Sequence, residues 1–325
     1  MSLKYEAMLA VQSIRPIRGR MPTKNTRDDY FRHIRAYLVW CKAEYGCRNI
    51  REAKPHLQDY ADYLVASDYT PATIHTYLNA CCRGCGVPLG SIRHPTRHAA
   101  DFTRGREIDL NKLKKMQQKS PRAVCLAFAV GIRRDEYLAL RVEDLVVDEN
   151  DYPCVQVRKG KGGKYQLQRI DPGQFDRVDK IFQSPALPDG RILRKAELRH
   201  LNLHAIRAIV AWAYYRHTCS RLETEPQYRS QLEQEIRDRW DIYCRHKWDE
   251  SQVRGTYWIR GRNRAYAVEH DLPIGFDRLA VKATSVFVLS HWRNDVTVDN
   301  YLLPGARMVN DIGWEPLLHF WKELG

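Results

Sequence analysis

Helical periodicity with clear start and stop signals runs through the first hundred residues and most constrains the fold. The segment from Thr23 to Gly46 begins with a capping residue, ends with a glycine, and carries apolar side chains three or four residues apart. The segments 52–67 and 70–82 repeat the pattern, with Thr70 as a cap. In the first helix the predicted buried face comprises Tyr30, Ile34, Tyr37, Leu38 and Cys41. We predict an all-α bundle over residues 1–100.

The pattern changes after residues 93–106, a basic segment without periodicity that we interpret as a linker. Beyond it the sequence predicts helices at 109–118, 121–130, 133–141, 204–217, 224–248 (capped by Thr224) and 275–292. Residues 154–171 are typical of two short strands joined by a Gly-Lys turn. The predicted fold class is therefore mainly α with a small β-sheet (α+β), in two domains, 1–100 and 101–325.

The chain is strongly basic. Its 325 residues include 53 lysines and arginines against 39 acidic residues, a formal net charge of +14. Such a surplus favours nucleic acid as a partner. No apolar run has the length of a membrane span, and the N-terminus lacks the apolar core of a signal peptide. We expect a cytoplasmic protein that binds nucleic acid, associated with the nucleoid if its source is prokaryotic.

The cysteines and histidines give little sign of a metal site. Nine cysteines, an odd number, are typical of a reduced cytosolic chain. Cys82 and Cys85 form a single Cys-x-x-Cys, and His200 and His204 are four residues apart, but neither pair has further ligands nearby in the sequence. We expect neither a metal nor a cofactor.

Four short motifs carry residue types suited to phosphate chemistry. In the first, Gly-Ile-Arg-Arg-Asp-Glu at 131–136, Arg133 either pairs with Glu136 one helical turn on or grips a phosphate. The others are a Gly-Lys-Gly-Gly-Lys turn at 160–164, His-Ala-Ile-Arg at 204–207, and a segment at 289–302. The candidate side chains are Arg133, Lys161 or Lys164, His204, Arg207, His291 and Tyr301.

In this order the motifs resemble those of the tyrosine recombinase family, which includes phage-type integrases. The resemblance covers about residues 106–303 and, loosely, the helical segment before them. It implies a helical DNA core-binding domain over 1–100 and a catalytic domain over 101–325. The catalytic residues that it implies are Arg133, Lys161, His204, Arg207, His291 and Tyr301.

The chain departs from the family pattern at two places. Ser290 stands where the family has a glycine before the third-motif histidine. His291 also lies much further along the chain from Arg207 than is usual in the family. We therefore interpret residues 216–270 as an insertion.

The chemistry that the resemblance implies requires these residue types together. A tyrosine can attack a DNA phosphodiester and form a 3′-phosphotyrosyl bond if a neighbour accepts its proton. Two arginines can stabilise charge on the non-bridging oxygens, and a lysine on a turn can protonate the 5′ leaving oxygen. The two histidines can hydrogen-bond the phosphate or manage the tyrosine proton. The resemblance thus implies a site-specific recombinase or integrase of a mobile element, acting as a homo-tetramer on paired DNA sites.

Other functions would use much the same residues. A type IB topoisomerase or a telomere resolvase has nearly the same chemistry, and a non-catalytic DNA-binding protein could keep the scaffold. At the C-terminus, Pro304 and Gly305 are expected to end the helix after Tyr301. Apolar residues over 314–324 then predict a short amphipathic helix, which either packs on its own domain or docks on a neighbouring protomer.

Overall fold

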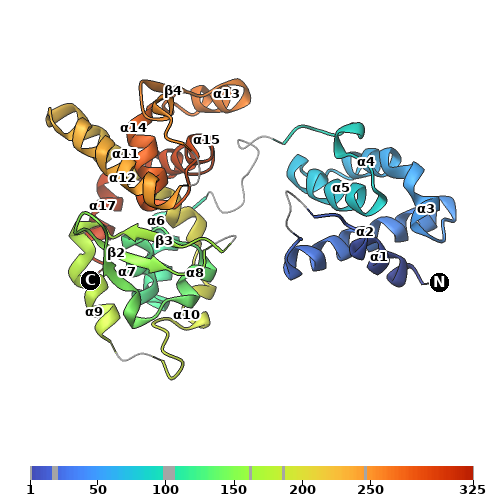
Figure 1. Cartoon of the computed structure of the whole chain (residues 1–325), viewed down its shortest axis with the longest axis horizontal. Helices are drawn as coiled ribbons and strands as arrows, with labels where there is room; N and C mark the ends of the chain where they lie inside the picture. The colour runs from blue at the N-terminus through green and yellow to red at the C-terminus, as the bar shows by residue number, and fades with distance from the viewer. Residues whose placement is uncertain are drawn as a thin grey trace. The chain divides into compact units, whose positions relative to one another are not determined.

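The computed structural model describes residues 2–16, 21–97, 107–160, 163–184, 187–244 and 247–324. It divides the chain into two compact units, Met1–Phe102 and Thr103–Gly325, here called the N-terminal unit and the C-terminal unit (Figure 1). Most of the predicted linker and Lys161 of the predicted turn lie outside the described residues. No helix in the described part of the chain is long and apolar enough to cross a membrane.

The N-terminal unit is helical throughout its described part, as the sequence predicts. Its elements are α1 (Leu3–Gln12), α2 (Lys24–Tyr45), α3 (Ile50–Ala53), the tight turn η1 (Lys54–His56), α4 (Leu57–Ala66), α5 (Pro71–Cys85) and the tight turn η2 (Leu89–Ser91). Helix α2 packs against α1 and α5, and α5 packs against α4. All five residues of the predicted apolar face of α2 are buried in the core of this unit.

The predicted helix signals of this unit are mostly confirmed. Thr23 caps α2 by accepting a hydrogen bond from a backbone N–H three residues on, and Gly46 ends the helix in the left-handed conformation, with a φ of 72°. Thr70 caps α5 in the same way. The helix predicted over 52–67 is interrupted, because Pro55 falls in the tight turn η1 and regular helix resumes only at α4.

The C-terminal unit combines many helices with two small sheets. Its helices are α6 (Leu110–Lys119), α7 (Pro121–Ala129), α8 (Arg134–Ala139), α9 (Phe175–Gln183), α10 (Lys195–Arg199), α11 (Leu203–Thr224), α12 (Tyr228–Tyr243), α13 (Gly261–Glu269), α14 (Arg278–Ala283), α15 (Asn294–Thr297), α16 (Leu303–Ile312) and α17 (Trp314–Lys322). Tight turns are η4 (Val142–Asp144), η5 (Pro172–Gln174) and η6 (Glu250–Gln252), and wide π-type turns are η7 (Thr284–Val288) and η8 (Val298–Leu302). The strands are β1 (Leu145–Val147), β2 (Pro153–Val157), β3 (Gln166–Arg169), β4 (Thr256–Trp258) and β5 (Gly275–Asp277). The predicted fold class, mainly α with a small β-sheet, is confirmed.

Helix α11 lies at the centre of the C-terminal core. It contacts α7, α14, α16 and both wide turns, and Ala205, Ile206 and Ile209 are fully buried. A helix that is apolar on nearly every side is buried on nearly every side. Arg207 belongs to this same stretch, so the packing of α11 carries a guanidinium into the interior.

The predicted hairpin is confirmed as β2 and β3, which pair antiparallel with Val155 opposite Gln168. Strand β1 adds a third member on the other side of β2, giving the order β1-β2-β3. The sequence analysis misses β1 because three residues are too few for alternation to appear. It also misses β5: the segment 275–292 begins as a strand paired with β4, and Asp277 then caps α14.

Two of the predicted helix ends are wrong. Helix α11 continues through Thr224, and α12 begins only at Tyr228. Nor does the chain break after Tyr301, because the wide turn η8 passes directly into α16. A widened turn accommodates the ring of Pro304, which an ordinary helical turn would exclude. Gly305 packs against α11 so closely that a Cβ atom at this position would lie 2.8 Å from the Cβ atom of Trp212.

The C-terminal helix α17 packs on its own unit, which is one of the two places predicted for it. Phe320 and Trp321 are buried edge-on against Phe128 of α7, with ring centroids 5.6 and 5.1 Å away. Arg177 of α9 donates hydrogen bonds to the carbonyls of Trp321 and Lys322, at 3.2 and 2.6 Å. The tail is therefore part of the core of the C-terminal unit.

The segment predicted as an insertion, 216–270, starts within α11 and includes α12, η6, β4 and α13. Helix α12 packs against α14, and a second small core forms from Tyr228, Leu232 and Ile236 with residues of α14 and η7. This segment is packed into the C-terminal unit rather than standing apart from it.

Candidate active site

Tyr301 lies in the wide turn η8 and is only 8% exposed. The centroid of its ring lies 5.6 Å from that of His204 and 5.8 Å from that of His291. The guanidinium carbon of Arg207 lies 5.3 Å from the centre of the same ring. Three of the predicted site residues, from α11 and the loop after η7, therefore lie around the side chain of a fourth, Tyr301 in η8. Wide turns of this kind are frequent at functional sites.

Arg207 is buried, and backbone carbonyls hold its guanidinium in place. Nη1 donates to the carbonyl of Gly131, and Nη2 donates to that of Leu289 at 2.6 Å, while the buried Nε has no partner among the described residues. Burial lowers the pKa of Arg207, and the nearby charge of Arg133 lowers it further. Because both bonds go to neutral carbonyls, a bound anion would offset much of the cost of burying this charge.

His291 is anchored by its backbone while its ring is left without partners. Its N–H donates to the carbonyl of Ser285 at 2.9 Å, and the Ser285 hydroxyl donates to the carbonyl of His291. Both ring nitrogens are buried and have no hydrogen-bond partner within the described ranges. Burial, followed by the charges of Arg207 and Arg133, lowers the pKa of His291 to about 3. The neutral imidazole therefore has one N–H to donate and one lone pair to accept a proton.

Arg133 forms the ion pair that was one of its two predicted alternatives. Its Nη1 lies 2.8 Å from Oε1 of Glu136, and its backbone N–H donates to Oε2 of the same carboxylate at 2.7 Å. The Arg133 side chain remains 30% exposed, and its charge lowers the pKa of both Arg207 and His291. Glu136 thus holds Arg133 at the accessible edge of the Tyr301 cluster.

Backbone hydrogen bonds close the turn between β2 and β3, and Gly163 and Lys164 in its described part are exposed. The N–H of Gly160 donates to the carbonyl of Lys164 at 2.7 Å, and Gly163 adopts a φ of 75°. Lys164 is exposed, and no hydrogen bond or ion pair within the described ranges joins it to the Tyr301 cluster. Lys161 lies outside the described residues, so the role of general acid stays a prediction for both lysines.

Ser290 occupies a backbone conformation that favours glycine. Its φ is 47°, in the left-handed region, and it directly precedes His291. The hydroxyl of Ser290 accepts a hydrogen bond from Nε2 of Gln168 in β3. This hydrogen bond to the sheet compensates for part of the backbone strain, which explains how a serine can occupy a position that favours glycine.

The sequence analysis misses two residues beside the cluster, Gln168 and Lys282. Lys282 is fully buried in α14 and donates to the carbonyl of Trp292, the residue after His291, at 2.7 Å. A single lysine within the apolar run 279–289 was a signal that could have identified it, because lysine is almost never fully buried without a partner. Gln168 carries no such signal, since its contact depends on the pairing of β3.

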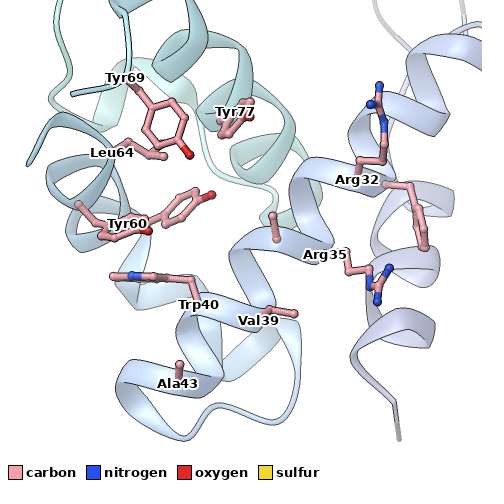
Figure 2. Close-up of a pocket in the computed structure, with 12 residues that line it drawn as sticks. Arg32, Arg35, Val39, Trp40, Ala43, Tyr60, Leu64, Tyr69 and Tyr77 are labelled. Atoms are coloured by element: carbon pink, nitrogen blue, oxygen red, sulfur yellow. The ribbon is translucent and has the colours of Figure 1, made fainter. Parts of the chain in front are cut away.

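A separate groove of about 580 Å³ lies in the N-terminal unit. Figure 2 shows aromatic rings from α2, α4 and α5 lining it, among them Trp40, Tyr60 and Tyr77, with Arg32 and Arg35 also on α2. The groove offers flat apolar faces and guanidinium groups, without a pair of residues suited to nucleophilic chemistry. It has the character of a binding surface, and the reactive residues gather in the C-terminal unit.

Comparison with known proteins gives little help with this site. No family model and no curated protein matches the chain. Among solved structures, the XerA recombinase is similar, with a TM-score of 0.25 and 13% sequence identity over 66% of this chain and 85% of that one. This similarity is too low to establish a shared fold or a function.

Proposed function

We propose that the chain is a site-specific DNA recombinase that breaks and rejoins DNA through a 3′-phosphotyrosyl intermediate. The observation that carries the proposal is the convergence of His204, Arg207 and His291 on the buried ring of Tyr301. Buried polar atoms normally have partners. Orphaned nitrogens on a cation and an imidazole beside a tyrosine are the arrangement expected of a site prepared for a phosphate.

The reaction assigns a role to each described residue of the cluster. The Tyr301 oxygen attacks the scissile phosphorus, a P–O bond to tyrosine forms, and the bond to the 5′ oxygen breaks. His204 or His291 accepts the tyrosine proton. Arg207 and the accessible Arg133 stabilise the charge on the non-bridging oxygens. The phosphotyrosine conserves the bond energy until a 5′-hydroxyl attacks it, so no nucleotide is consumed.

The leaving 5′ oxygen needs a proton as its bond breaks. The proposal gives this role to Lys161, with Lys164 as the alternative in the same turn. A substrate with sulfur at the bridging 5′ position separates the two, because a thiolate leaves without a proton. That substrate should restore cleavage by Lys161→Ala but leave Lys164→Ala unaffected, and the reverse result would move the role to Lys164.

The partner in this proposal is double-stranded DNA, bound by both units of a strongly basic chain. The N-terminal unit would act as the DNA core-binding domain and the C-terminal unit as the catalytic domain. Assembly as a homo-tetramer on paired sites, and a place in a mobile element as its integrase, belong to the same proposal. Binding should weaken steeply with salt, since each neutralised phosphate contributes about 0.9 to the log–log slope.

The test is a covalent adduct on nicked duplexes that the protein itself has selected from a random pool. The native chain should form a DNA–protein adduct that survives denaturing gels. Tyr301→Phe should bind the same duplexes without forming it, while the control variants Tyr257→Phe and Tyr266→Phe should form it normally. An adduct that persists in Tyr301→Phe would refute the assignment. Exchange of strands between two duplexes would separate a recombinase from a topoisomerase, which only relaxes supercoils.

A further inference from the structure

We infer that helix α12 and the turn η6, together with Lys282, form a bracket that positions the His291 loop, residues 289–294, against Tyr301. The inference rests on the proposed function and gives a purpose to the segment interpreted above as an insertion. The members of the bracket are residues of α12, η6 and α14. They are positioning residues that act through His291.

Lys282 is the first contact of the bracket. Its ammonium group is fully buried and donates to the carbonyl of Trp292 at 2.7 Å and to Oε1 of Gln252 in η6 at 2.6 Å. One cation thus joins the His291 loop to the insertion. Burial of an ammonium is costly unless hydrogen bonds compensate for it, so these two acceptors determine where the side chain can lie.

Gln252 is the second contact, and it binds the loop through its backbone as well. Its carbonyl accepts a hydrogen bond from Nδ2 of Asn294 at 2.7 Å. Its side-chain amide is oriented from the other end, where Nε2 donates to Asp249 at 3.3 Å. Gln252 therefore contacts both Lys282, which binds the carbonyl of Trp292, and the side chain of Asn294, so the loop is held at two residues that follow His291.

Aromatic packing supplies the third contact. Trp292 in the loop lies edge-on to Trp240 of α12, with ring centroids 5.2 Å apart. Trp240 in turn packs edge-on against Trp248. The ammonium of Lys282 lies 5.3 Å from the ring centroid of Trp240. Edge-to-face pairs of this kind have a preferred geometry, so they orient the residue next to His291 rather than merely covering it.

The bracket is itself fixed to the sheet. Arg239 of α12 is buried and donates to Asp148 at 2.6 Å, to Glu149 at 2.7 Å and to the carbonyl of Leu167 at 3.0 Å. Arg169 of β3 bonds the same Asp148 carboxylate at 2.7 Å and reaches Glu235 of α12 at 2.7 Å. Helix α12 thus connects the hairpin that carries the turn lysines to the loop that carries His291.

This arrangement suits the state of the His291 ring. Neither buried ring nitrogen of His291 has a hydrogen-bond partner among the described residues, so the backbone on both sides has to hold the ring in position. Ser285 holds His291 from one side, and Lys282 and Gln252 hold the residues that follow it. Loosening the bracket should therefore misplace the imidazole while leaving the DNA-contacting surfaces intact.

The experiment measures two quantities on the full chain: backbone hydrogen exchange at residues 289–294, and the rate of adduct formation on selected nicked duplexes at saturating protein. Lys282→Met and Gln252→Ala each remove contacts of the bracket, and Gln252→Ala keeps the protein testable should Lys282→Met fail to fold. Gln252→Glu retains an acceptor for Lys282. Lys247→Met, an exposed lysine of the same segment, is the matched control.

Both bracket variants should raise exchange in the His291 loop and slow adduct formation by roughly tenfold to hundredfold, with DNA affinity unchanged, as expected for a misplaced catalytic group. Gln252→Glu should restore most of the rate, and the control should behave as the native chain. Unchanged loop exchange, or an unchanged rate, would overturn the bracket. If the native chain itself formed no adduct, the proposed function would fail, and loop exchange would still decide whether the bracket holds the loop.

Discussion

The two units differ in how completely they satisfy their buried polar groups. In the N-terminal unit the hydroxyl of the buried Tyr37 donates to the carbonyl of Ala53, and the buried Glu6 accepts from a backbone N–H at 3.3 Å. Within the described ranges, every buried side-chain nitrogen or oxygen that lacks a partner belongs to the C-terminal unit. Several of these atoms lie at or beside the Tyr301 cluster, on Arg207, His291 and Asn294.

This difference indicates what each unit is built for. A segment that only has to fold and present a surface can pair every polar group, and the N-terminal unit approaches that state. Natural chains depart from such consistency mainly at functional sites, where unpaired groups and strained backbone await a ligand. The orphaned nitrogens place that departure in the described part of the C-terminal unit, where the left-handed Ser290 directly precedes His291.

The largest expected effect contrasts the packing of two glycines. Gly305→Ala places a methyl group against the backbone and Trp212 of α11 and should cost about 3 kcal/mol of stability, since overpacked cores must shift. Gly90→Ala in the N-terminal unit meets nothing within 4 Å and should be nearly neutral. Chemical denaturation of each variant measures the difference. Equal small effects would show that α16 can move away from α11.

The next effect concerns the buried guanidinium. Arg207→Lys keeps a charge but loses the fork that reaches Gly131 and Leu289, so adduct formation should slow by roughly a hundredfold, or about 3 kcal/mol of barrier. Arg51→Lys, an exposed change in the N-terminal unit, serves as the control. Single-turnover cleavage of nicked duplexes measures both. A normal rate for Arg207→Lys would remove Arg207 from the reaction.

The third expected effect is on the pH dependence of stability. The pKa of His291 lies at about 3 in the folded chain, below its ordinary value of 6.5, so between these values the unfolded chain binds more protons. Stability of the C-terminal unit should therefore fall as the pH drops from 6.5 towards 3, by up to about 1.4 kcal/mol per pH unit from this group alone. His291→Asn should flatten this slope in denaturation measured from pH 7 to pH 4. An unchanged slope would mean that the ring is not buried as a neutral group.

The smallest effect compares two left-handed residues, Ser290 beside the site and Asp68 in the turn after α4, whose φ values are 47° and 58°. At each position the glycine variant should be more stable than the alanine variant by about 1 kcal/mol, because only alanine carries a Cβ into this region. At Ser290 both variants also lose the hydrogen bond from Gln168, so Ser290→Gly should lie close to the native chain. Thermal unfolding of the four variants measures this. A difference at Asp68 but none at Ser290 would show that the loop relaxes.

Local signals in the sequence were enough for much of the fold. Capping by Thr23 and Thr70, the apolar face of α2, and the alternation on either side of the Gly-Lys turn each depend on neighbours within a few residues. Such features appear in any chain that folds locally as its propensities indicate. The cap predicted at Thr224 and the helix break predicted at Pro304 are both wrong, because capping and breaking are only preferences. Packing around α11 overrides the first, and a widened turn accommodates the second.

The candidate site divides in the same way. The sequence alone singled out Arg133, His204, Arg207, His291 and Tyr301 as residue types suited to one reaction. Only the tertiary structure brought His204, Arg207 and His291 around the ring of Tyr301, decided between the two alternatives for Arg133, and buried both ring nitrogens of His291 without a hydrogen-bond partner among the described residues. It alone placed Lys282 and Gln252 beside the loop. Burial and most of the hydrogen bonds at the site depend on segments that are far apart in the chain. The spacing of residues within a motif does not determine which distant carbonyl or carboxylate will bind a given side chain.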